Sequence, residues 1–348
     1  MTSTMKAAVK RRPVPMATEV AQVPVPEPRP DEVLIRVAIA SICGTDLHIY
    51  EWDEWAQGRI KTPLIQGHEF AGSVERVGSS VSGYSKGDYV SAEGHIPCGR
   101  CGPCRTGSPH VCRNVRILGI DRDGSFAEYL TVPASNVIRN DPGLPVELAT
   151  MQDPLGNAVY TVSNATVPGK SVAIFGLGPI GLMAVALCRA KAAGRVIAIG
   201  RENEYRKALA KVVGADLVLE SDGGLVDAVL EATDGEGVDE VLEFAGNDQA
   251  LRQAIRVVRP AGGIHILGIY PRPVTVDMSE VVTKGVTIHG IHGRLMFRTW
   301  EQMRGLLRSG NVNLLPILTH RFPLERYNEA MQVVKGGQCG KVSFPMEA

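Results

Sequence analysis

The sequence predicts an α/β protein of two domains, a mostly β domain followed by a doubly wound parallel sheet. At 348 residues the chain is too long for one ordinary core. Its N-terminal part consists of short apolar segments separated by glycine and proline, which is typical of a compact β domain. Beyond about Pro154, apolar strands alternate with helical segments. Such alternation is typical of a parallel sheet covered by helices on both faces.

The composition excludes several functional classes. Lys+Arg 37 and Asp+Glu 37 balance to a formal net charge of zero, whereas binders of nucleic acid or of anionic membranes need a basic field. No apolar run is long enough to span a bilayer, and the N-terminus lacks the apolar region of a signal peptide. We therefore expect a cytoplasmic protein without nucleic-acid or membrane partners. The 7 cysteines, several of them close together, favour metal binding over a disulfide framework.

Potential metal ligands follow the first well-defined strand, which we predict at Val33–Ala40. Cys43 comes directly after it, and the tripeptide Gly67-His68-Glu69 lies further along. A thiolate, an imidazole and a carboxylate are groups that hold a catalytic zinc, which takes three protein ligands and keeps one position open. Taken singly, each is explained as a buried thiol, a hydrogen-bonded imidazole or a solvated carboxylate. The metal interpretation therefore depends on the accompanying motifs.

A second group of potential ligands is the run Cys98-Gly-Arg-Cys101-Gly-Pro-Cys104, followed by Cys112. Thiols at this spacing can surround one tetrahedral zinc, and the glycines let the backbone turn around it. Iron–sulfur ferredoxin motifs open with a similar run, but their fourth cysteine follows more closely and precedes a proline. Cys112 instead precedes Arg113. We predict a closed structural zinc site held by these four thiols.

The second domain begins with a strand, a glycine motif and a helix. The apolar strand Lys170–Phe175 runs directly into Gly176-Leu-Gly178-Pro-Ile-Gly181, and Leu182–Ala193 is predicted as a helix. Between a strand and a helix, these glycines form the dinucleotide-binding fingerprint. They allow a tight turn and close approach of a pyrophosphate, to which the helix N-terminus offers free N–H groups. Further strands are predicted at Val196–Ile199, Val218–Glu220, Val238–Phe244 and Gly263–Leu267.

The residues after the second strand of this domain bear on the choice of cofactor. In this fold an acid normally binds the adenosine ribose there and selects NAD over NADP. Here the strand runs into Gly200-Arg201, with Arg206 following. Two guanidinium groups favour the 2′-phosphate of NADP, so we expect NADP rather than NAD. In the alternative interpretation, Glu202 reaches the ribose and both arginines are solvated surface charges.

Together these motifs resemble the zinc-dependent medium-chain alcohol dehydrogenases along nearly the whole chain. The family resemblance is carried by Cys43-Gly-Thr-Asp, Gly67-His-Glu, the four-cysteine segment and Gly176-Leu-Gly-Pro-Ile-Gly. The chain is most similar to the L-threonine 3-dehydrogenase branch, although polyol and aminosugar dehydrogenases share parts of the pattern. The branch features are Ser41 to Tyr50, Trp52-Asp-Glu-Trp55, Glu93-Gly-His95, Asp153-Pro-Leu-Gly-Asn-Ala158 and Gly293 to Trp300.

This resemblance implies a fold, an activity and cofactors. A discontinuous GroES-like catalytic domain of residues 1–154 and 297–348 would accompany a Rossmann domain of residues 155–296. Two zinc ions per chain, NADP or NAD, and a homotetramer are implied. The implied substrate is a small hydroxyl compound, L-threonine, oxidised to 2-amino-3-oxobutanoate. The alternative within the family is a polyol, sugar or secondary-alcohol dehydrogenase or reductase. A dinucleotide binder without turnover is disfavoured by the relay residues Thr45 and His48.

The resemblance also implies roles for individual residues. The implied ligands of the catalytic zinc are Cys43, His68 and Glu69. Asp153 would lie beside the metal, either as a ligand or acting through water. Thr45 and His48 would relay the substrate proton, His95 would influence substrate preference, and Arg294 is a candidate partner for a substrate carboxylate. The positions that match cofactor contacts are Gly176, Gly178, Ile180, Gly181, Arg201, Arg206, Leu267, Gly268, Ile269, Ile291 and His292.

Overall fold

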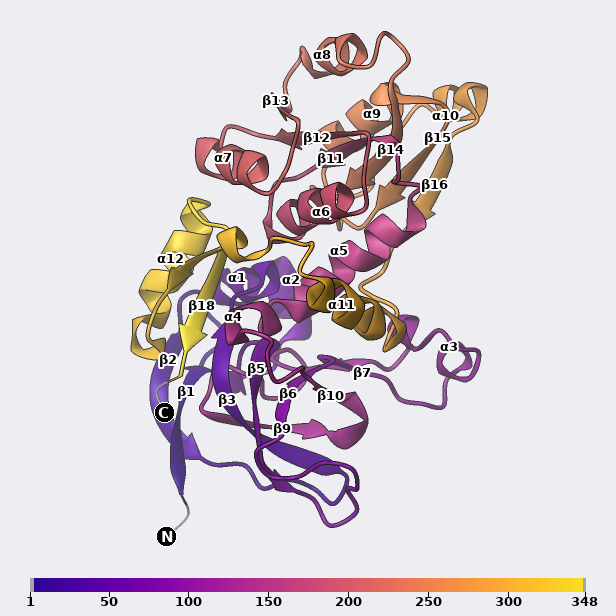
Figure 1. Ribbon diagram of the computed structural model, residues 1–348. Coiled ribbons are helices and arrows are strands. Elements are labelled where there is room, and N and C mark those ends of the chain that lie inside the picture. The colour runs from indigo at the N-terminus through magenta and orange to yellow at the C-terminus, as the bar shows by residue number, and fades with distance from the viewer. Residues whose placement is uncertain (1–2, 347–348) are drawn as a thin grey trace. The chain divides into compact units, whose positions relative to one another are not determined.

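The computed structural model describes residues 3–346 and divides the chain into two compact units (Figure 1). Unit 1 combines the residues up to Pro154 with those from Leu318 onward, and unit 2 is Leu155–Ile317. Residues 297–317, which the sequence analysis assigned to the first domain, fall in unit 2. The reason is local packing, because Met303 lies 3.5 Å from where a side chain at Gly156 would begin.

Unit 1 is built mainly from antiparallel strands and short helices. Its strands are β1 (Thr4–Lys10), β2 (Thr18–Pro24), β3 (Glu32–Ser41), β4 (Leu64–Ile65), β5 (Glu69–Val77), β6 (Tyr89–Ala92), β7 (His95–Ile96), β8 (Arg116–Ile117), β9 (Tyr129–Pro133), β10 (Val137–Arg139), β17 (Leu318–Arg321) and β18 (Lys341–Pro345). Its helices are α1 (Gly44–Glu51), α2 (Glu54–Arg59), α3 (Gly102–Arg105), α4 (Val146–Ala149) and α12 (Tyr327–Gly336), with single 3₁₀ turns η1 (Pro109–Val111), η2 (Ala134–Asn136) and η4 (Leu324–Arg326). Helix α5 (Gln152–Asn164) begins in unit 1 and continues into unit 2.

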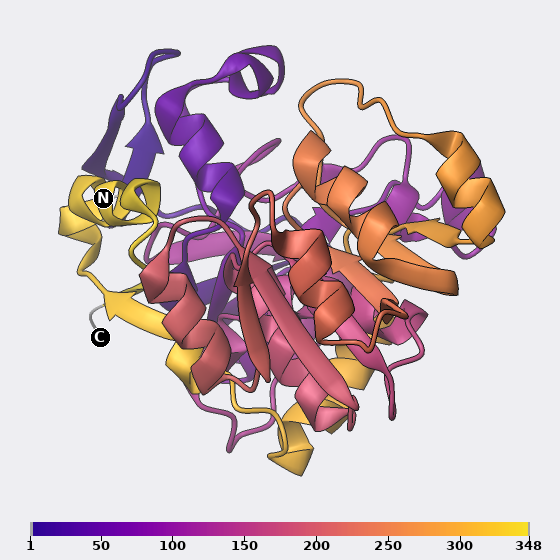
Figure 2. The same cartoon turned by 90° about the horizontal axis from the view of Figure 1, so that it is seen from above.

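Strand β3 is the centre of the main sheet of unit 1. This 7-stranded sheet has the order β10-β6-β5-β3-β18-β17, with β9 paired to β3 off that path. The predicted strand Val33–Ala40 is thus confirmed within β3, and its buried side chains Val33, Ile35 and Val37 enter the main core of the unit. The C-terminal segment completes this sheet, because β18 pairs antiparallel with β3 and α12 packs on β2 (Figure 2).

Unit 2 is a parallel sheet with helical connections. Its strands are β11 (Ser171–Phe175), β12 (Arg195–Gly200), β13 (Leu217–Glu220), β14 (Val238–Glu243), β15 (Val258–Ile266) and β16 (Thr287–Gly290). Its helices, besides α5, are α6 (Pro179–Ala190), α7 (Glu204–Val212), α8 (Leu225–Glu231), α9 (Asp248–Val257), α10 (Met278–Lys284) and α11 (Arg298–Ser309), followed by the 3₁₀ turn η3 (Leu315–Ile317).

The strand order of unit 2 is β13-β12-β11-β14-β15-β16, with every neighbouring pair parallel. This is the order of the dinucleotide-binding doubly wound fold, with the switch point between β11 and β14. The predicted fold class is therefore confirmed. Helix α6 begins at Pro179, inside the glycine motif and earlier than expected, because proline is pre-organised for the first helical turn. Within residues 3–346, no helix combines the length and apolar character needed to cross a bilayer.

Candidate metal and dinucleotide sites

The first candidate site begins where β3 passes into α1. Cys43 is the N-cap of α1, and its backbone N–H donates to Asp46 Oδ2 at 2.9 Å. Asp46 is fully buried, and this burial raises the pKa of its carboxyl. Asp46 thereby fixes the backbone from which the Cys43 thiol projects. This is the supporting role expected of a carboxylate next to a metal ligand.

Gly67 brings two further side chains to Cys43. Its φ is +91°, and an added Cβ would lie 2.5 Å from the Phe126 ring, so only glycine fits this turn. His68 and Glu69 follow it, and potential ligand atoms of Cys43, His68 and Glu69 all lie within 4.8 Å of one another. Nδ1 of His68 and Oε1 of Glu69 are buried, with no hydrogen-bond partner among the described residues. Because buried polar atoms are rarely unpaired, this donor set fits a bound cation.

The surroundings of His68 stabilise positive charge. Burial by itself lowers the pKa of His68, but the neighbouring Cys43, Asp46 and Asp153 raise it to about 10. A position where acidic groups converge on a buried imidazole favours a cation, whether a proton or a metal. The electrostatics of this cluster therefore agree with its donor set.

A buried lysine compensates one side of the Glu69 carboxylate. Lys341 extends from β18, forms an ion pair with Glu69 Oε2 and donates to the Ile42 carbonyl at 2.8 Å. Ser41 Oγ also donates to Glu69 Oε2, at 2.5 Å. The side chains of Lys341 and Glu69 are 2% and 0% exposed. Burial lowers the pKa of Lys341, but Glu69 and Cys43 outweigh it, and the net shift is upward. No local pattern in the sequence connects Lys341 with Glu69, so this pair could not be predicted.

A third group of potential ligands consists of Glu93, His95 and Asp153, whose ligand atoms also lie within 4.8 Å of one another. Glu93 Oε1 accepts from the His95 backbone N–H at 2.9 Å and lies 3.0 Å from His95 Nδ1. An added Cβ on Gly94 would lie 3.5 Å from Asp153 Oδ1 and 3.6 Å from His68 Cβ. The turn between Glu93 and His95 thus lies directly against the first candidate site.

The two predicted relay residues lie on α1. The Cys43 thiol donates to Thr45 Oγ1 at 3.8 Å, so the Thr45 hydroxyl is next to a predicted zinc ligand. The His48 side chain is 59% exposed, and its Nδ1 lies 2.5 Å from Asp53 Oδ2. Asp53 also caps α2 by accepting from the Ala56 N–H at 3.0 Å. Asp53 therefore connects His48 with the start of α2, and nothing in the sequence indicated this contact.

The four clustered cysteines come together as expected. The ligand atoms of Cys98, Cys101, Cys104 and Cys112 lie within 4.8 Å of one another. The Cys101 sulfur is 3.4 Å from that of Cys104 and 3.7 Å from that of Cys112. Zinc–sulfur bonds of about 2.3 Å in a tetrahedron would separate the sulfurs by about 3.8 Å. The backbone N–H groups of Arg100 and Cys101 lower the pKa of Cys98 to about 6. These thiols fit a four-coordinate metal.

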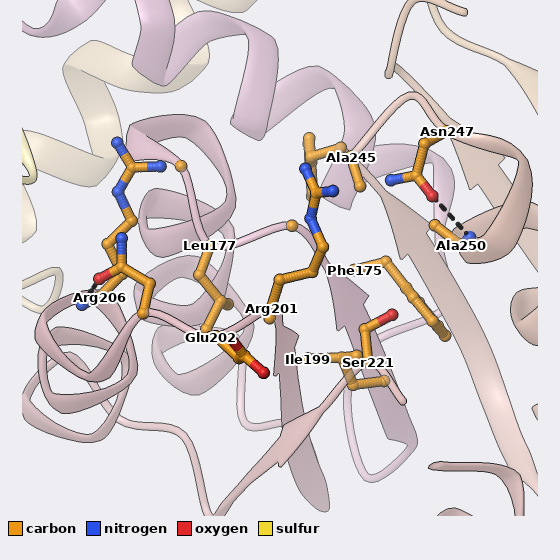
Figure 3. Close-up of a pocket in the computed structure, with 15 residues that line it drawn as sticks. Phe175, Leu177, Ile199, Arg201, Glu202, Arg206, Ser221, Ala245, Asn247 and Ala250 are labelled. Carbon is orange, nitrogen blue, oxygen red and sulfur yellow. Dashed lines mark hydrogen bonds between the residues drawn. The ribbon is translucent and has the colours of Figure 1, made fainter. Parts of the chain in front are cut away.

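The glycine motif of unit 2 borders a cavity of ≈ 410 Å³ (Figure 3). Gly176 and Gly178 line it, whereas Gly181 lies in the first turn of α6. A Cβ on Gly181 would lie 1.9 Å from the Gly176 carbonyl oxygen, so the third glycine is needed for the close packing of helix and strand. Arg201 and Arg206 also line the cavity. This arrangement has the shape of a dinucleotide phosphate site at a helix N-terminus.

The remaining predicted positions also lie in unit 2. Leu267, Gly268 and Ile269 follow β15, and Ile180 is in the first turn of α6. The segment after β16 contains Ile291 and His292, and the Ile291 N–H donates to the Ile266 carbonyl at 2.8 Å. Arg294 is only 2% exposed, and its guanidinium lies 3.3 Å from Asn157 Oδ1 and 5.9 Å from the Trp300 ring centre.

Comparisons with known proteins agree with this geometry. Residues 29–142 match the alcohol dehydrogenase GroES-like domain, and residues 179–309 match the zinc-binding dehydrogenase family. The chain is 48% identical over 344 residues to the L-threonine 3-dehydrogenase of Bacillus licheniformis, covering 98% of this chain and 99% of the relative. The L-threonine 3-dehydrogenase of Pyrococcus horikoshii is 48% identical over 350 residues, covering 100% of both. Among solved structures, a zinc-binding dehydrogenase from Sinorhizobium meliloti 1021 bound to NADP superposes with a TM-score of 0.90 at 30% identity, covering 99% of each chain.

Proposed function

The chain belongs to the zinc-binding dehydrogenase family, and on that premise we propose that it is an L-threonine 3-dehydrogenase. In the proposed reaction, the C3–H bond of L-threonine breaks and its hydride passes to the nicotinamide of NAD(P)⁺. The C3 hydroxyl loses its proton, and the products are 2-amino-3-oxobutanoate, NAD(P)H and a proton. Among the observations, the convergence of Cys43, His68 and Glu69 carries the most weight, since their ligand atoms lie within 4.8 Å of one another.

Cys43, His68 and Glu69 would hold the catalytic zinc. The unpaired buried atoms His68 Nδ1 and Glu69 Oε1 support this assignment. When bound, zinc acts as a Lewis acid that lowers the pKa of a hydroxyl group at its open position. Lys341 and Ser41 occupy the other Glu69 oxygen and so restrict the carboxylate to one orientation. Asp153 lies close enough to raise the pKa of His68, so it contributes negative charge to the same site.

Thr45 and His48 would move the substrate proton away. A threonine hydroxyl both donates and accepts hydrogen bonds, which a relay position requires. The proximity of Thr45 Oγ1 to the Cys43 sulfur, 3.8 Å, supports this role. The Asp53 carboxylate accepts from His48 Nδ1 at 2.5 Å, so Nε2 is the ring nitrogen left to take the proton. The exposure of His48 then allows release of the proton to solvent.

We also propose NADP as the preferred cofactor. Figure 3 shows the guanidinium groups of Arg201 and Arg206 extending toward the top of the view on either side of Leu177, while the Glu202 carboxylate points toward the bottom. Arg201 directly follows β12, Arg206 lies in the first turn of α7, and two such cations on one cavity suit a 2′-phosphate. Removing one charge-assisted contact costs about 1.5–3 kcal/mol. We therefore expect Arg201→Ala to weaken NADPH binding at least tenfold and to leave NADH binding within about twofold.

The four-cysteine site would hold a second, structural zinc, which gives two metal ions per chain. Metal analysis of the purified protein checks this number. The cytoplasmic location expected from the composition and the homotetramer implied by the resemblance stay predictions. Light scattering on the purified protein measures the oligomeric state.

A substrate screen tests the proposed function. Zinc-loaded protein is assayed with L-threonine, 2,3-butanediol and sorbitol, each with NAD and with NADP. We expect the largest kcat/KM with L-threonine, and loss of that activity in Cys43→Ala with the fold retained by circular dichroism. Higher kcat/KM with either diol or polyol would favour the alternative function within the family. Turnover retained in Cys43→Ala would contradict the assignment of the metal site.

A further inference from the structure

Glu243 is a fully buried carboxylate in unit 2 that the proposed chemistry does not use. It is the last residue of β14 and 0% exposed. Burial raises the pKa of its carboxyl, while hydrogen bonds from Gly246, Tyr270 and Ala245 oppose that shift. A carboxylate removed from water in this way needs donors on both oxygens, and the structure provides them from two different loops.

The first loop is the turn between β14 and α9. Glu243 Oε1 accepts the N–H groups of Ala245 at 2.6 Å and Gly246 at 2.8 Å. Ala245 is also part of the wall of the dinucleotide cavity. The carboxylate therefore fixes the backbone of a cavity-lining turn.

The second loop follows β15. Tyr270 donates its hydroxyl to Glu243 Oε2 at 2.9 Å. The backbone carbonyl of Glu243 accepts from Leu267 at 2.9 Å and Gly268 at 3.1 Å. One glutamate thus holds both ends of the segment 267–270. This segment includes three of the positions at which the sequence predicts cofactor contacts.

The two loops touch each other at glycines. A Cβ on Gly268 would lie 2.4 Å from the Gly246 nitrogen and 2.5 Å from Glu243 Oε2. A Cβ on Gly246 would lie 2.6 Å from the Ile269 carbonyl oxygen. Only glycine therefore fits at positions 246 and 268, where the two loops cross. At this crossing, the Glu243 side chain connects the two backbones.

The position of this crossing suggests its role. The cavity lined by Arg201 and Arg206 lies mostly along the β11–β13 half of the sheet, which would hold the adenosine end of a dinucleotide, and Ala245 of the β14–α9 turn borders it from the other half. The other half, β14–β16, is left for the nicotinamide end. The loops joined by Glu243 both leave the carboxyl ends of strands in that second half, where ligands bind in such sheets.

We propose that Glu243 is a positioning residue for the dinucleotide, which holds the β14–α9 turn against segment 267–270 so that together they form a fixed seat for the nicotinamide half. This inference rests on the dinucleotide-binding part of the proposed function and not on the choice of alcohol substrate. Its test is therefore a binding measurement and needs no turnover.

The test compares Glu243→Gln with the parent protein and with Glu240→Gln. Glutamine has nearly the same shape but no charge, so it removes the charge that strengthens the hydrogen bonds from Ala245, Gly246 and Tyr270. Glu240 is on the same strand and pairs with His265 at 2.9 Å, so its variant controls for an equivalent change away from the crossing. The ligands are NADPH, followed by nicotinamide fluorescence, and adenosine 2′,5′-bisphosphate, which represents the adenosine half alone and is followed by calorimetry.

We expect Glu243→Gln to raise the Kd of NADPH about tenfold, as the loss of charge-assisted hydrogen bonds implies. The Kd of the bisphosphate should stay within twofold of the parent value, and Glu240→Gln should leave both Kd values within twofold. Amide hydrogen exchange should become faster over 243–247 and 267–270 in Glu243→Gln. Should Glu243→Gln fail to fold, Tyr270→Phe, which removes one donor, should show the same pattern at a smaller size.

Unchanged NADPH affinity in Glu243→Gln, or an equal loss for NADPH and the bisphosphate in a folded variant, would overturn the inference. A parent protein that binds neither NADH nor NADPH would overturn the proposed function together with the inference. Tight NADPH binding without threonine turnover would contradict only the proposed function.

Discussion

Lys341→Met should sharply destabilise unit 1, because it removes one partner of a buried ion pair. The Lys341 and Glu69 side chains are 2% and 0% exposed. Methionine resembles the apolar stem of lysine but lacks the ammonium group, so it leaves Glu69 Oε2 with only the Ser41 hydroxyl. Breaking a buried pair from one side typically costs about 3–5 kcal/mol. We expect the free energy of unfolding to fall by that amount.

Urea unfolding followed by tryptophan fluorescence and circular dichroism measures this change. A chelator is present throughout, because a bound cation next to Glu69 would replace the lost ammonium charge. The matched control is Lys335→Met, which removes an ion pair of 2.8 Å with Glu51 whose side chains are 55% and 39% exposed. Exposed pairs contribute about 0–1 kcal/mol, so the control should change the free energy of unfolding by less than about 1 kcal/mol.

The double variant Lys341→Met with Glu69→Gln tests the reason for the effect. Replacing both members of a buried pair by neutral groups is often close to neutral, so the double variant should recover most of the lost stability. If Lys341→Met lowers the free energy of unfolding by no more than Lys335→Met does, the Lys341–Glu69 pair is not desolvated as described, and the reasoning is refuted. The same follows if the double variant is no more stable than Lys341→Met.

Three further predictions concern other parts of unit 1. Burial lowers the pKa of Lys10 to about 8, so between pH 8 and its unfolded value of about 10.4 the folded chain has lost a proton that the unfolded chain retains. The parent should therefore become more stable relative to Lys10→Met as the pH rises through that window, which denaturant titrations at pH 7 and pH 10 measure. Asp53→Asn keeps a residue able to cap α2 but removes the anion beside His48. The kcat for L-threonine should therefore fall roughly tenfold, with little change in melting temperature. An unchanged kcat would contradict the role of the Asp53–His48 contact in turnover. Cys112→Ser removes one of four thiols, and metal analysis should show one zinc fewer per chain while the Cys43 site stays loaded.

The sequence predicted best those features that depend on neighbouring residues. The strand, glycine motif and helix from Lys170 onward could be recognised, because the turn, the helix N-terminus and the phosphate site are one local structure. The four cysteines were likewise grouped by spacing alone. Strand β3 was recognised from its apolar run. In each case the physical constraint and the pattern lie in the same stretch of chain.

Helices α1 and α2 could not be recognised in the sequence, and the reason is physical. Both are short, and α1 has no clear apolar face, so periodicity gives no signal. Their limits are set by individual contacts, such as Asp53 capping α2 and Trp52 ending α1 in a left-handed conformation. The boundary at residue 297 was misplaced for a similar reason, because the packing of Met303 near Gly156 joins residues distant in sequence.

Two buried glutamates show why a metal ligand and a positioning residue cannot be told apart by sequence alone. Glu69 and Glu243 are both 0% exposed, so burial alone would make either of them a candidate metal ligand. Glu69 has one oxygen bound by Lys341 and Ser41, while Oε1 lacks a hydrogen-bond partner among the described residues. Both oxygens of Glu243 are occupied by donors from the protein itself. An unpaired buried oxygen costs about 1–3 kcal/mol, so one that lies within a cluster of potential metal ligands favours a bound cation there. The distribution of donors over the two oxygens therefore favours Glu69 as the proposed metal ligand and Glu243 as a residue that holds the backbone.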